Sequence, residues 1–325
     1  MSEHILEVKN LTTHFFTKEG VVRAIDGVDL YVNKNEAIGL VGESGCGKTQ
    51  TAFSILRIVP IPGKIVDGEV ILNGIDLLKL SEKEMQNIRG KDISITFQDP
   101  MTFLNPVIKI KNQIAEALMH HDQEISSRDS FERAVDLLRQ MKITYPEKMS
   151  ESYPHQLSGG MRQRALIAMA MCLDPAILIA DEPTTALDVT IQAQIISLMK
   201  DLKENSDTSI LLITHDLGIV AEICDRVYVM YAGRIVESGT VFEIFDEALH
   251  PYTQGLLKAV LSIDEFKKEL VTIEGSVPQL IDPPPGCRFN PRCEFAMEIC
   301  RKEVPEMIEI SSGHKTACWL YKEDN

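Results

Sequence analysis

Hydrophobic and polar positions follow two periods along this chain, and each period predicts a kind of element. Short segments near the N-terminus alternate between apolar and polar residues, as in half-buried strands. Uninterrupted apolar runs of strand length, such as 37–41, indicate strands that are buried on both faces. The expected strands cover residues 6–8, 28–32, 37–41, 68–72, 93–97, 177–181, 210–214, 226–231 and 234–236. Because segments of helical spacing lie between many of these strands, we expect an α/β core with a mainly parallel, two-sided sheet.

Changes in this pattern indicate where the chain divides. A capping box at 81–84 predicts a short helix that Gly90 ends. Helical spacing dominates 106–150, which we interpret as a helical insertion, and a further helix is expected at 161–172. Beyond about residue 260, prolines break regular structure. We therefore expect a domain over 1–260, with a helical subdomain at about 106–172, and a C-terminal extension over 261–325.

Composition narrows the class of protein. The chain has 325 residues, enough for one large domain and an appendage. Its 33 lysines and arginines against 48 acidic residues give a net charge of −15, which disfavours a main role in binding nucleic acid. No apolar run approaches the roughly 18 residues of a membrane span, and the N-terminus lacks the pattern of a signal peptide. We expect a cytoplasmic location and reduced cysteines.

The segment Gly42–Thr49, GESGCGKT, matches the phosphate-binding pattern G-x-x-x-x-G-K-[ST]. A predicted strand precedes it and a predicted helix follows it, which is the context this loop requires. Lys48 is expected to reach the β- and γ-phosphates, and Thr49 to bind Mg²⁺. The residues expected to contact the nucleotide are Gly42, Glu43, Ser44, Gly45, Cys46, Gly47, Lys48, Thr49 and Gln50.

Polar residues at the ends of three other predicted strands suit the same chemistry. Asp181 ends an apolar strand and is expected to bind the metal, while Glu182 is placed to activate the attacking water. His215 follows another strand and is expected to contact the γ-phosphate or hold that water. Gln98, at a third strand, is expected to touch Mg²⁺ and water. Without the phosphate loop, each of these residues reads as an ordinary residue at a strand end.

A second anion-binding turn lies in Leu157–Arg164, LSGGMRQR. Gly159 and Gly160 let backbone N–H groups approach a ligand, and the following helix offers its positive N-terminal end. Ser158 precedes the two glycines. One ordinary nucleotide site does not need two phosphate-binding turns.

The order of these segments resembles an ATP-binding cassette (ABC) ATPase subunit of a transporter, over residues 1 to about 260. The resemblance implies a RecA-like P-loop core with an antiparallel β subdomain and a helical subdomain. It implies that Ser158, Gly159 and Gly160 bind the γ-phosphate of ATP held by an opposite subunit. It also implies that Asp188 links the two sites and that Gln98 relays nucleotide state to the membrane subunits. Phe16, with Phe15 as its neighbour, stands where the family stacks an aromatic ring on adenine.

A narrower resemblance is to the dipeptide and oligopeptide importer ATPases. It is carried by the segments DVTIQAQ at 188–194, FQDP at 97–100 with LNP at 104–106, HPYT at 250–253 and GCRFNPRC at 286–293. It implies a second, related ATPase as partner (or a homodimer in isolation), two permease subunits, an external binding protein and a peripheral place on the cytoplasmic face of the membrane. Nickel or another small solute is the alternative cargo, and a soluble ABC ATPase without a transport role is the alternative class.

Four of the seven cysteines lie close together near the C-terminus. Cys287, Cys293, Cys300 and Cys318 have five, six and seventeen residues between them. Four thiolates suit a tetrahedral sulfur site, and the loose spacing favours a 4Fe-4S cluster, with zinc or no metal as alternatives. Such a site would serve structure or docking, or act as a redox sensor. His314 is expected to be a solvated loop residue, with replacement of one cysteine ligand as its alternative role. Trp319 is expected to anchor the tail, and Cys172 and Cys224 are expected to be packing residues.

Overall fold

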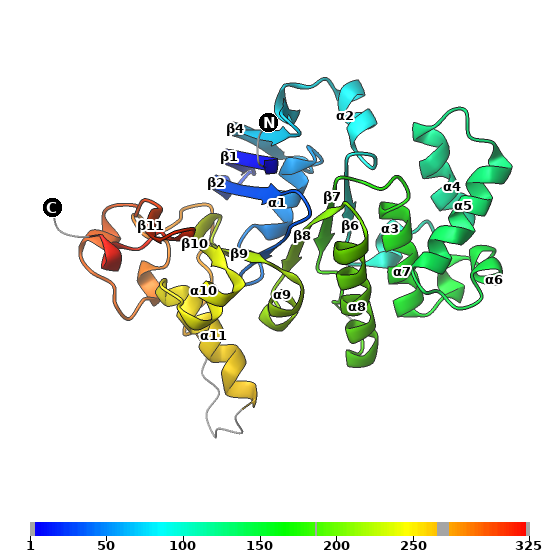
Figure 1. Ribbon diagram of the computed structural model, residues 1–325. Coiled ribbons are helices and arrows are strands. Elements are labelled where there is room, and N and C mark those ends of the chain that lie inside the picture. The colour runs from blue at the N-terminus through cyan, green and yellow to red at the C-terminus, as the bar shows by residue number, and fades with distance from the viewer. Residues whose placement is uncertain (1–3, 186, 265–272, 323–325) are drawn as a thin grey trace. The chain divides into compact units, whose positions relative to one another are not determined.

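The computed structural model describes residues 4–185, 187–264 and 273–322. Its contacts divide the chain into two compact units, both discontinuous in sequence. The first unit comprises Met1–Val32, Ala37–Leu78 and Ile213–Asn325, and the second comprises Asn33–Glu36 and Lys79–Leu212. Both units mix helices and strands (Figure 1), as the sequence predicts for an α/β chain.

An antiparallel sheet near the N-terminus belongs to the first unit. It contains β1 (His4–Phe16), β2 (Val21–Asn33), β4 (Gly63–Leu72) and β5 (Ile75–Asp76), in the order β2-β1-β4-β5. β1 pairs with β4 so that Leu6 faces Leu72 and Val8 faces Val70, and all four side chains are buried. The alternating pattern therefore sets which face of this sheet is packed.

A second group of strands in the first unit follows the order β11-β12-β10-β9-β3. These are β3 (Ala37–Val41), β9 (Arg226–Tyr231), β10 (Arg234–Thr240), β11 (Ile308–Ser311) and β12 (His314–Thr316). β3 and β9 are parallel, whereas β10 is antiparallel to β9 and to β12. The helices are α1 (Lys48–Ile55), α9 (Leu217–Ile223), α10 (Val241–Asp246) and α11 (Pro251–Asp264). The C-terminal segment thus adds a β-hairpin to this sheet, which its sequence pattern does not predict.

The second unit carries a short run of sheet and most of the helices. β6 (Ile93–Thr96) runs parallel to β7 (Ile177–Asp181), and β8 (Ser209–Thr214) follows β7 in the order, its last two residues belonging to the first unit. The helices are α2 (Glu82–Ile88), α3 (Pro100–Phe103), α4 (Ile110–His121), α5 (Ser127–Gln140), α6 (Pro146–Ser150), α7 (Gly159–Ala170) and α8 (Val189–Asn205). Helices are present within 106–150, where helical spacing predicts them: α4, α5 and α6 pack together, and α4 and α5 contact α7 (Figure 1). The capping box at Ser81 is confirmed as well.

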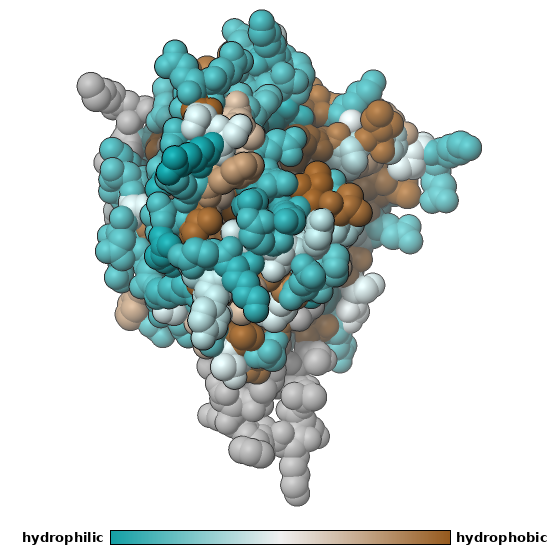
Figure 2. Space-filling view, turned by 90° about the vertical axis from the view of Figure 1, so that its right-hand side faces the viewer, coloured by the Kyte–Doolittle hydropathy of each residue, from teal (hydrophilic) through white to brown (hydrophobic). Residues whose placement is uncertain are grey.

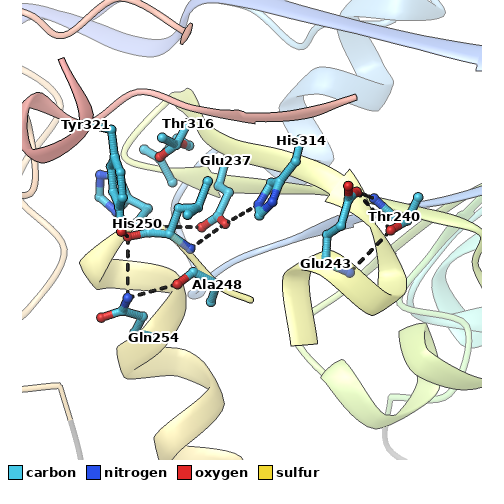
Figure 3. Close-up of polar contacts among 11 residues, drawn as sticks. Glu237, Thr240, Glu243, Ala248, His250, Gln254, His314, Thr316 and Tyr321 are labelled. Atoms are coloured by element: carbon cyan, nitrogen blue, oxygen red, sulfur yellow. Dashed lines mark hydrogen bonds and ion pairs between the residues drawn. The ribbon is translucent and has the colours of Figure 1, made fainter. Parts of the chain in front are cut away.

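A buried acid–imidazole pair fixes the C-terminal hairpin to β10 (Figure 3). Glu237 is fully buried and accepts hydrogen bonds from the backbone N–H groups of Leu249 (2.8 Å) and His250 (2.9 Å). Its third partner is the Nε2 atom of His314, also at 2.8 Å. The expectation of a solvated His314 is therefore wrong, because pairing of β12 with β10 buries this ring to 2% exposure.

No helix in the described parts of the chain combines the length and apolar character needed to cross a membrane. Cys172 and Cys224 are both buried, which confirms the interpretation of these two residues as packing residues.

Candidate functional site

The glycine loop joins β3 to α1 in the first unit, and its backbone shape excludes side chains at two positions. Gly42 and Gly47 have φ angles of 154° and 114°, which L-residues rarely adopt. A Cβ atom on Gly42 would lie 2.2 Å from the carbonyl oxygen of Met230, and one on Gly47 would lie 2.5 Å from that of Ala24. Glycine is therefore required at both positions for the loop to pass so close to its neighbours.

Lys48 lies inside this loop. The side chain is buried, and its Nζ atom donates to the carbonyl oxygens of Gly42 (2.7 Å) and Glu43 (3.1 Å). Gly47 is the N-cap of α1 and supplies no side-chain cap, so the first N–H groups of the helix face the loop. Next to it, the buried Oε1 atom of Gln50 has no hydrogen-bond partner within the described ranges. The Lys48 ammonium and the N–H groups at the uncapped start of α1 fit a nucleotide phosphate chain, and the amide oxygen of Gln50 fits a cation such as Mg²⁺.

The second unit holds the carboxylates of the expected catalytic group. β7 delivers Asp181, which is buried, and Glu182 follows in the left-handed region with φ 45°. The Oε2 atom of Glu182 accepts hydrogen bonds from Nε2 of Gln98 (2.8 Å) and from Oγ1 of Thr185 (2.9 Å). Gln98 and Glu182, which are 84 residues apart, are therefore brought together. Thr185 was not among the residues predicted from the sequence, although its place three residues after Glu182 in a polar turn is a signal for it.

The turn that the sequence predicts to bind a second anion lies at the start of α7. This helix begins at Gly159, two residues before the predicted start, because Ser158 acts as its N-cap and accepts from the N–H of Met161 at 3.3 Å. A Cβ atom on Gly160 would lie 2.5 Å from Cγ2 of Ile191, so this glycine allows α7 to approach α8. Ser158 is exposed, which leaves the N-terminal end of α7 open to an anion from outside the chain.

Asp188 has a local structural role besides the link between two sites that the resemblance implies. It is the N-cap of α8, where its carboxylate accepts from the N–H of Ile191 at 2.9 Å. Ile191 is the residue that contacts Gly160. The cap of α8 and the start of α7 are thus neighbours within the second unit.

Two further predicted residues lie in the first unit. His215 directly follows β8 and is exposed, while Asp216 caps α9 by accepting from the N–H of Gly218 at 2.8 Å. Phe16 ends β1 with 46% exposure, and Nζ of Lys64 lies 5.8 Å from its ring centroid. Phe15 instead packs so closely on Gly63 that a Cβ atom there would lie 2.7 Å from the ring. Of the two rings, Phe16 is the one that is open to a stacking partner.

The four C-terminal cysteines converge on one place in the first unit. They line a cavity of about 10 Å³ together with His250, Phe289, Trp319 and other residues. Burial raises the pKa of the Cys287 and Cys318 thiols to about 11, and it also raises the pKa of the Cys293 thiol above its ordinary value. Trp319 donates its indole N–H to the carbonyl oxygen of Glu303 at 3.1 Å, which anchors the tail as expected.

No metal centre is formed by these groups as they stand. Across the part of the chain that the structure describes, no cluster of three or more His, Cys, Asp or Glu side chains is arranged to hold a metal ion. The four cysteines are free thiols. The 4Fe-4S cluster and its zinc alternative therefore stay predictions.

Comparison with known proteins is consistent with this geometry. Residues 25–185 match the family described as ABC transporter, and residues 236–300 match the oligopeptide/dipeptide transporter C-terminal region. The chain is 51% identical to the oligopeptide transport ATP-binding protein OppD of Bacillus subtilis (strain 168), over 98% of this chain and 90% of that protein. It is 50% identical to AppD, an oligopeptide transport ATP-binding protein of the same strain, over 98% of each. Its structure resembles that of the dimeric, post-hydrolysis ATP-binding cassette MJ0796 bound to ADP and Pi, with a TM-score of 0.66 and 27% identity over 73% of this chain and 98% of that one.

Proposed function

The chain belongs to the ATP-binding proteins of ABC transporters and is an ATPase, and from this premise we propose that it powers the import of oligopeptides or dipeptides through separate permease subunits. Two relatives matched over 98% of the chain are oligopeptide transport ATP-binding proteins. The match of residues 236–300 to the C-terminal region of oligopeptide/dipeptide transporters supports the same cargo.

We propose that the reaction is in-line attack of water on the γ-phosphate of ATP, which releases ADP and phosphate. Lys48 stabilises the phosphate charge, and Glu182 accepts the proton of the attacking water. The hydrogen bonds from Gln98 and Thr185 orient the carboxylate of Glu182. Thr49, Gln98 and Asp181 would hold Mg²⁺, which neutralises charge on the phosphates when it is bound.

The observation that carries the proposal is that two helices of the chain begin in turns suited to binding phosphate. α1 begins in the glycine loop with Lys48, whereas α7 begins at the exposed Ser158 turn without a lysine of its own. We infer that the Ser158 turn completes the ATP site of a second ATPase subunit, so that two chains enclose two nucleotides. His215 contacts the γ-phosphate and Phe16 stacks on adenine in this arrangement, and Asp188 lies beside the shared boundary.

The test is Glu182→Gln, measured by ATP hydrolysis and by the ATP-dependent mass of the complex. We expect hydrolysis to fall by about 100-fold or more and an ATP-bound dimer to accumulate. Glu204→Gln, an exposed glutamate on α8, is the matched control and should leave both measurements unchanged. A normal hydrolysis rate in Glu182→Gln would remove Glu182 from the mechanism.

We propose that the permeases dock on the helical part of the second unit, close in sequence to Gln98. Met101, Phe103 and Val107 are exposed there, Val107 by 77%. Val107 also lines a hollow of about 350 Å³ with Lys109, Phe131 and other residues. Figure 2 views the molecule from the side on which α4, α5 and α6 lie and shows hydrophobic residues among hydrophilic ones. Such exposed apolar groups favour a protein interface.

Docking of permeases would place the chain at the cytoplasmic face of the membrane. Val107→Asp should abolish co-purification with co-expressed permease subunits, whereas Ile61→Asp, a change at a 96% exposed residue of the first unit, should not. Purification with the second ATPase tests the heterodimer. Stimulation of ATP hydrolysis by the external binding protein loaded with a peptide, and not by one loaded with nickel, tests the cargo.

We propose further that Cys287, Cys293, Cys300 and Cys318 ligate a 4Fe-4S cluster, with zinc as the alternative. The support is that all four thiols line one cavity. Since about 10 Å³ accommodates roughly one water molecule, the thiols must separate to admit a cluster. Iron, sulfide and zinc analysis of anaerobically purified protein, with absorbance near ~400 nm, decides between them. Less than one equivalent of either metal would refute the proposal.

A further inference from the structure

An arginine of the C-terminal segment is bound to the phosphate loop. Arg292 forms a two-pronged ion pair with Glu43, with its NH1 atom 2.7 Å from Oε2 and its NH2 atom 3.0 Å from Oε1. Its other donors reach the carbonyl oxygens of Glu274 (2.8 Å) and Ile273 (3.2 Å) and the hydroxyl of Tyr231 (3.4 Å). All five N–H donors of the guanidinium are therefore engaged, and the side chain is only 5% exposed. Arg292 is held in place and cannot itself swing to a nucleotide.

The backbone of Glu43 is held by a second residue of the first unit. The hydroxyl of the fully buried Tyr252, on α11, accepts a hydrogen bond from the Glu43 N–H at 2.8 Å. The Tyr252 ring packs on Tyr231 and Phe289, with centroids 4.6 and 5.4 Å away. Phe289 lies in the same cysteine-bearing segment as Arg292. The side chain of Glu43 is thus fixed by Arg292 of the C-terminal extension, and its main chain by Tyr252, which packs on Phe289 of that extension.

Glu43 is an acidic residue within a loop that binds an anion. It directly follows Gly42, and its carbonyl oxygen is one of the two that accept from Nζ of Lys48. A free carboxylate here would repel the phosphates and compete for Lys48. The Glu43 hydrogen bonds also raise the pKa of Arg292 above its ordinary value, so the cation persists at any physiological pH.

We propose that Arg292 is a positioning residue of the ATP site: it neutralises Glu43, points its carboxylate away from the phosphates, and so makes nucleotide binding depend on the C-terminal extension. The inference rests on the proposed function, in which ATP binds at Gly42–Thr49. It assigns the extension a role in the affinity for ATP, besides any part in docking or metal binding.

The test is a double-mutant cycle on the full-length chain, read as the dissociation constant of a fluorescent ATP analogue with Mg²⁺. Arg292→Ala should weaken binding about tenfold, the size expected for one like charge close to a phosphate near a protein surface. In a Glu43→Gln background, Arg292→Ala should weaken binding by less than about twofold, because position 43 then carries no negative charge for Arg292 to neutralise. The Arg292→Ala loss should also shrink in 0.5 M salt, which a packing defect would not do.

Two further variants separate positioning from folding. Arg292→Lys keeps the charge and should recover most of the affinity while losing the two-pronged geometry. Arg288→Ala is the matched control, since Arg288 is a 7% exposed arginine of the same segment that pairs with Asp26 on β2. Equal losses for Arg292→Ala with and without Glu43→Gln, or an equal loss for Arg288→Ala, would overturn the proposal. Failure of the unmodified chain to bind Mg-ATP would instead refute the proposed function.

Discussion

Removal of the His314 imidazole should detach the C-terminal hairpin from β10. The ring provides one of three hydrogen bonds to Glu237, a carboxyl group with no solvent exposure (Figure 3). In His314→Ala, the two backbone donors remain, but the carboxyl group of Glu237 loses its imidazole partner and faces a new cavity. Breaking a buried pair of this kind typically costs about 3 to 5 kcal/mol.

That loss can be followed by thermal unfolding. For a folded unit of this size, a loss of about 3 kcal/mol in the free energy of unfolding corresponds to a fall in Tm of roughly 6–12 °C. Limited proteolysis should reveal earlier cleavage near the hairpin, since local opening costs less than global unfolding. Lys315→Ala is the matched control on the same strand, because Lys315 makes only an exposed ion pair with Glu309 at 3.7 Å.

A second substitution should partly rescue the His314→Ala variant. If the cost comes from an unpaired buried carboxylate, adding Glu237→Gln to His314→Ala should recover part of the lost stability. A Tm for His314→Ala that matches that of Lys315→Ala would refute this account. So would a double variant that is less stable than the sum of the two single changes predicts.

Three further changes test other parts of the structure. Gly47→Ala should abolish nucleotide binding, because the added Cβ atom would lie 2.5 Å from a backbone carbonyl oxygen. The Cβ atom of Gly45→Ala meets no atom within 4 Å, so backbone strain should lower the free energy of unfolding of this variant in urea by only about 1 kcal/mol. Gly160→Ala should destabilise the packing of α7 on α8 by about 1–3 kcal/mol, and the additional change Ile191→Ala should relieve it; no relief would disprove the clash. Burial raises the pKa of the Cys172 thiol from 9.0 to about 11. Between pH 9 and 11 the unfolded chain therefore loses this proton before the folded chain does, and the free energy of unfolding should fall by about 1.4 kcal/mol per pH unit, whereas below pH 9 it is unaffected. Cys172→Ala should reduce this alkaline loss of stability in urea unfolding.

Local features of the sequence predict the parts of the site that are built from consecutive residues. The glycine loop is formed by consecutive residues between one strand and one helix, so the sequence of Gly42–Thr49 is enough to predict its position and a phosphate ligand. The same holds for Ser158 as the start of a helix and for Ser81 as a capping box. In each case the hydrogen bonds join residues within a few positions, which makes the pattern readable along the chain.

Contacts between distant segments were not predictable in this way. Arg292 and Glu43 are 249 residues apart, and neither residue type indicates the other as its partner. His314 reads as a surface residue until strand pairing buries it beside Glu237, 77 residues away. Such pairs cannot be read from the sequence, because many arginines and glutamates in the chain would satisfy the same chemistry. Which two of them meet depends on where the elements that carry them pack.

The sequence by itself determined which chemistry to expect of this protein: it predicts a phosphate loop, a carboxylate pair and a second anion-binding turn, each from a few consecutive residues. The tertiary structure decided how that chemistry is held. It brings three hydrogen-bond partners around Glu237 and places Gln98 in hydrogen-bonding contact with Glu182. It also pairs Glu43 of the loop with Arg292 of the C-terminal extension. The physical reason is that local backbone preferences act between neighbours, whereas burial selects partners only after the elements have packed.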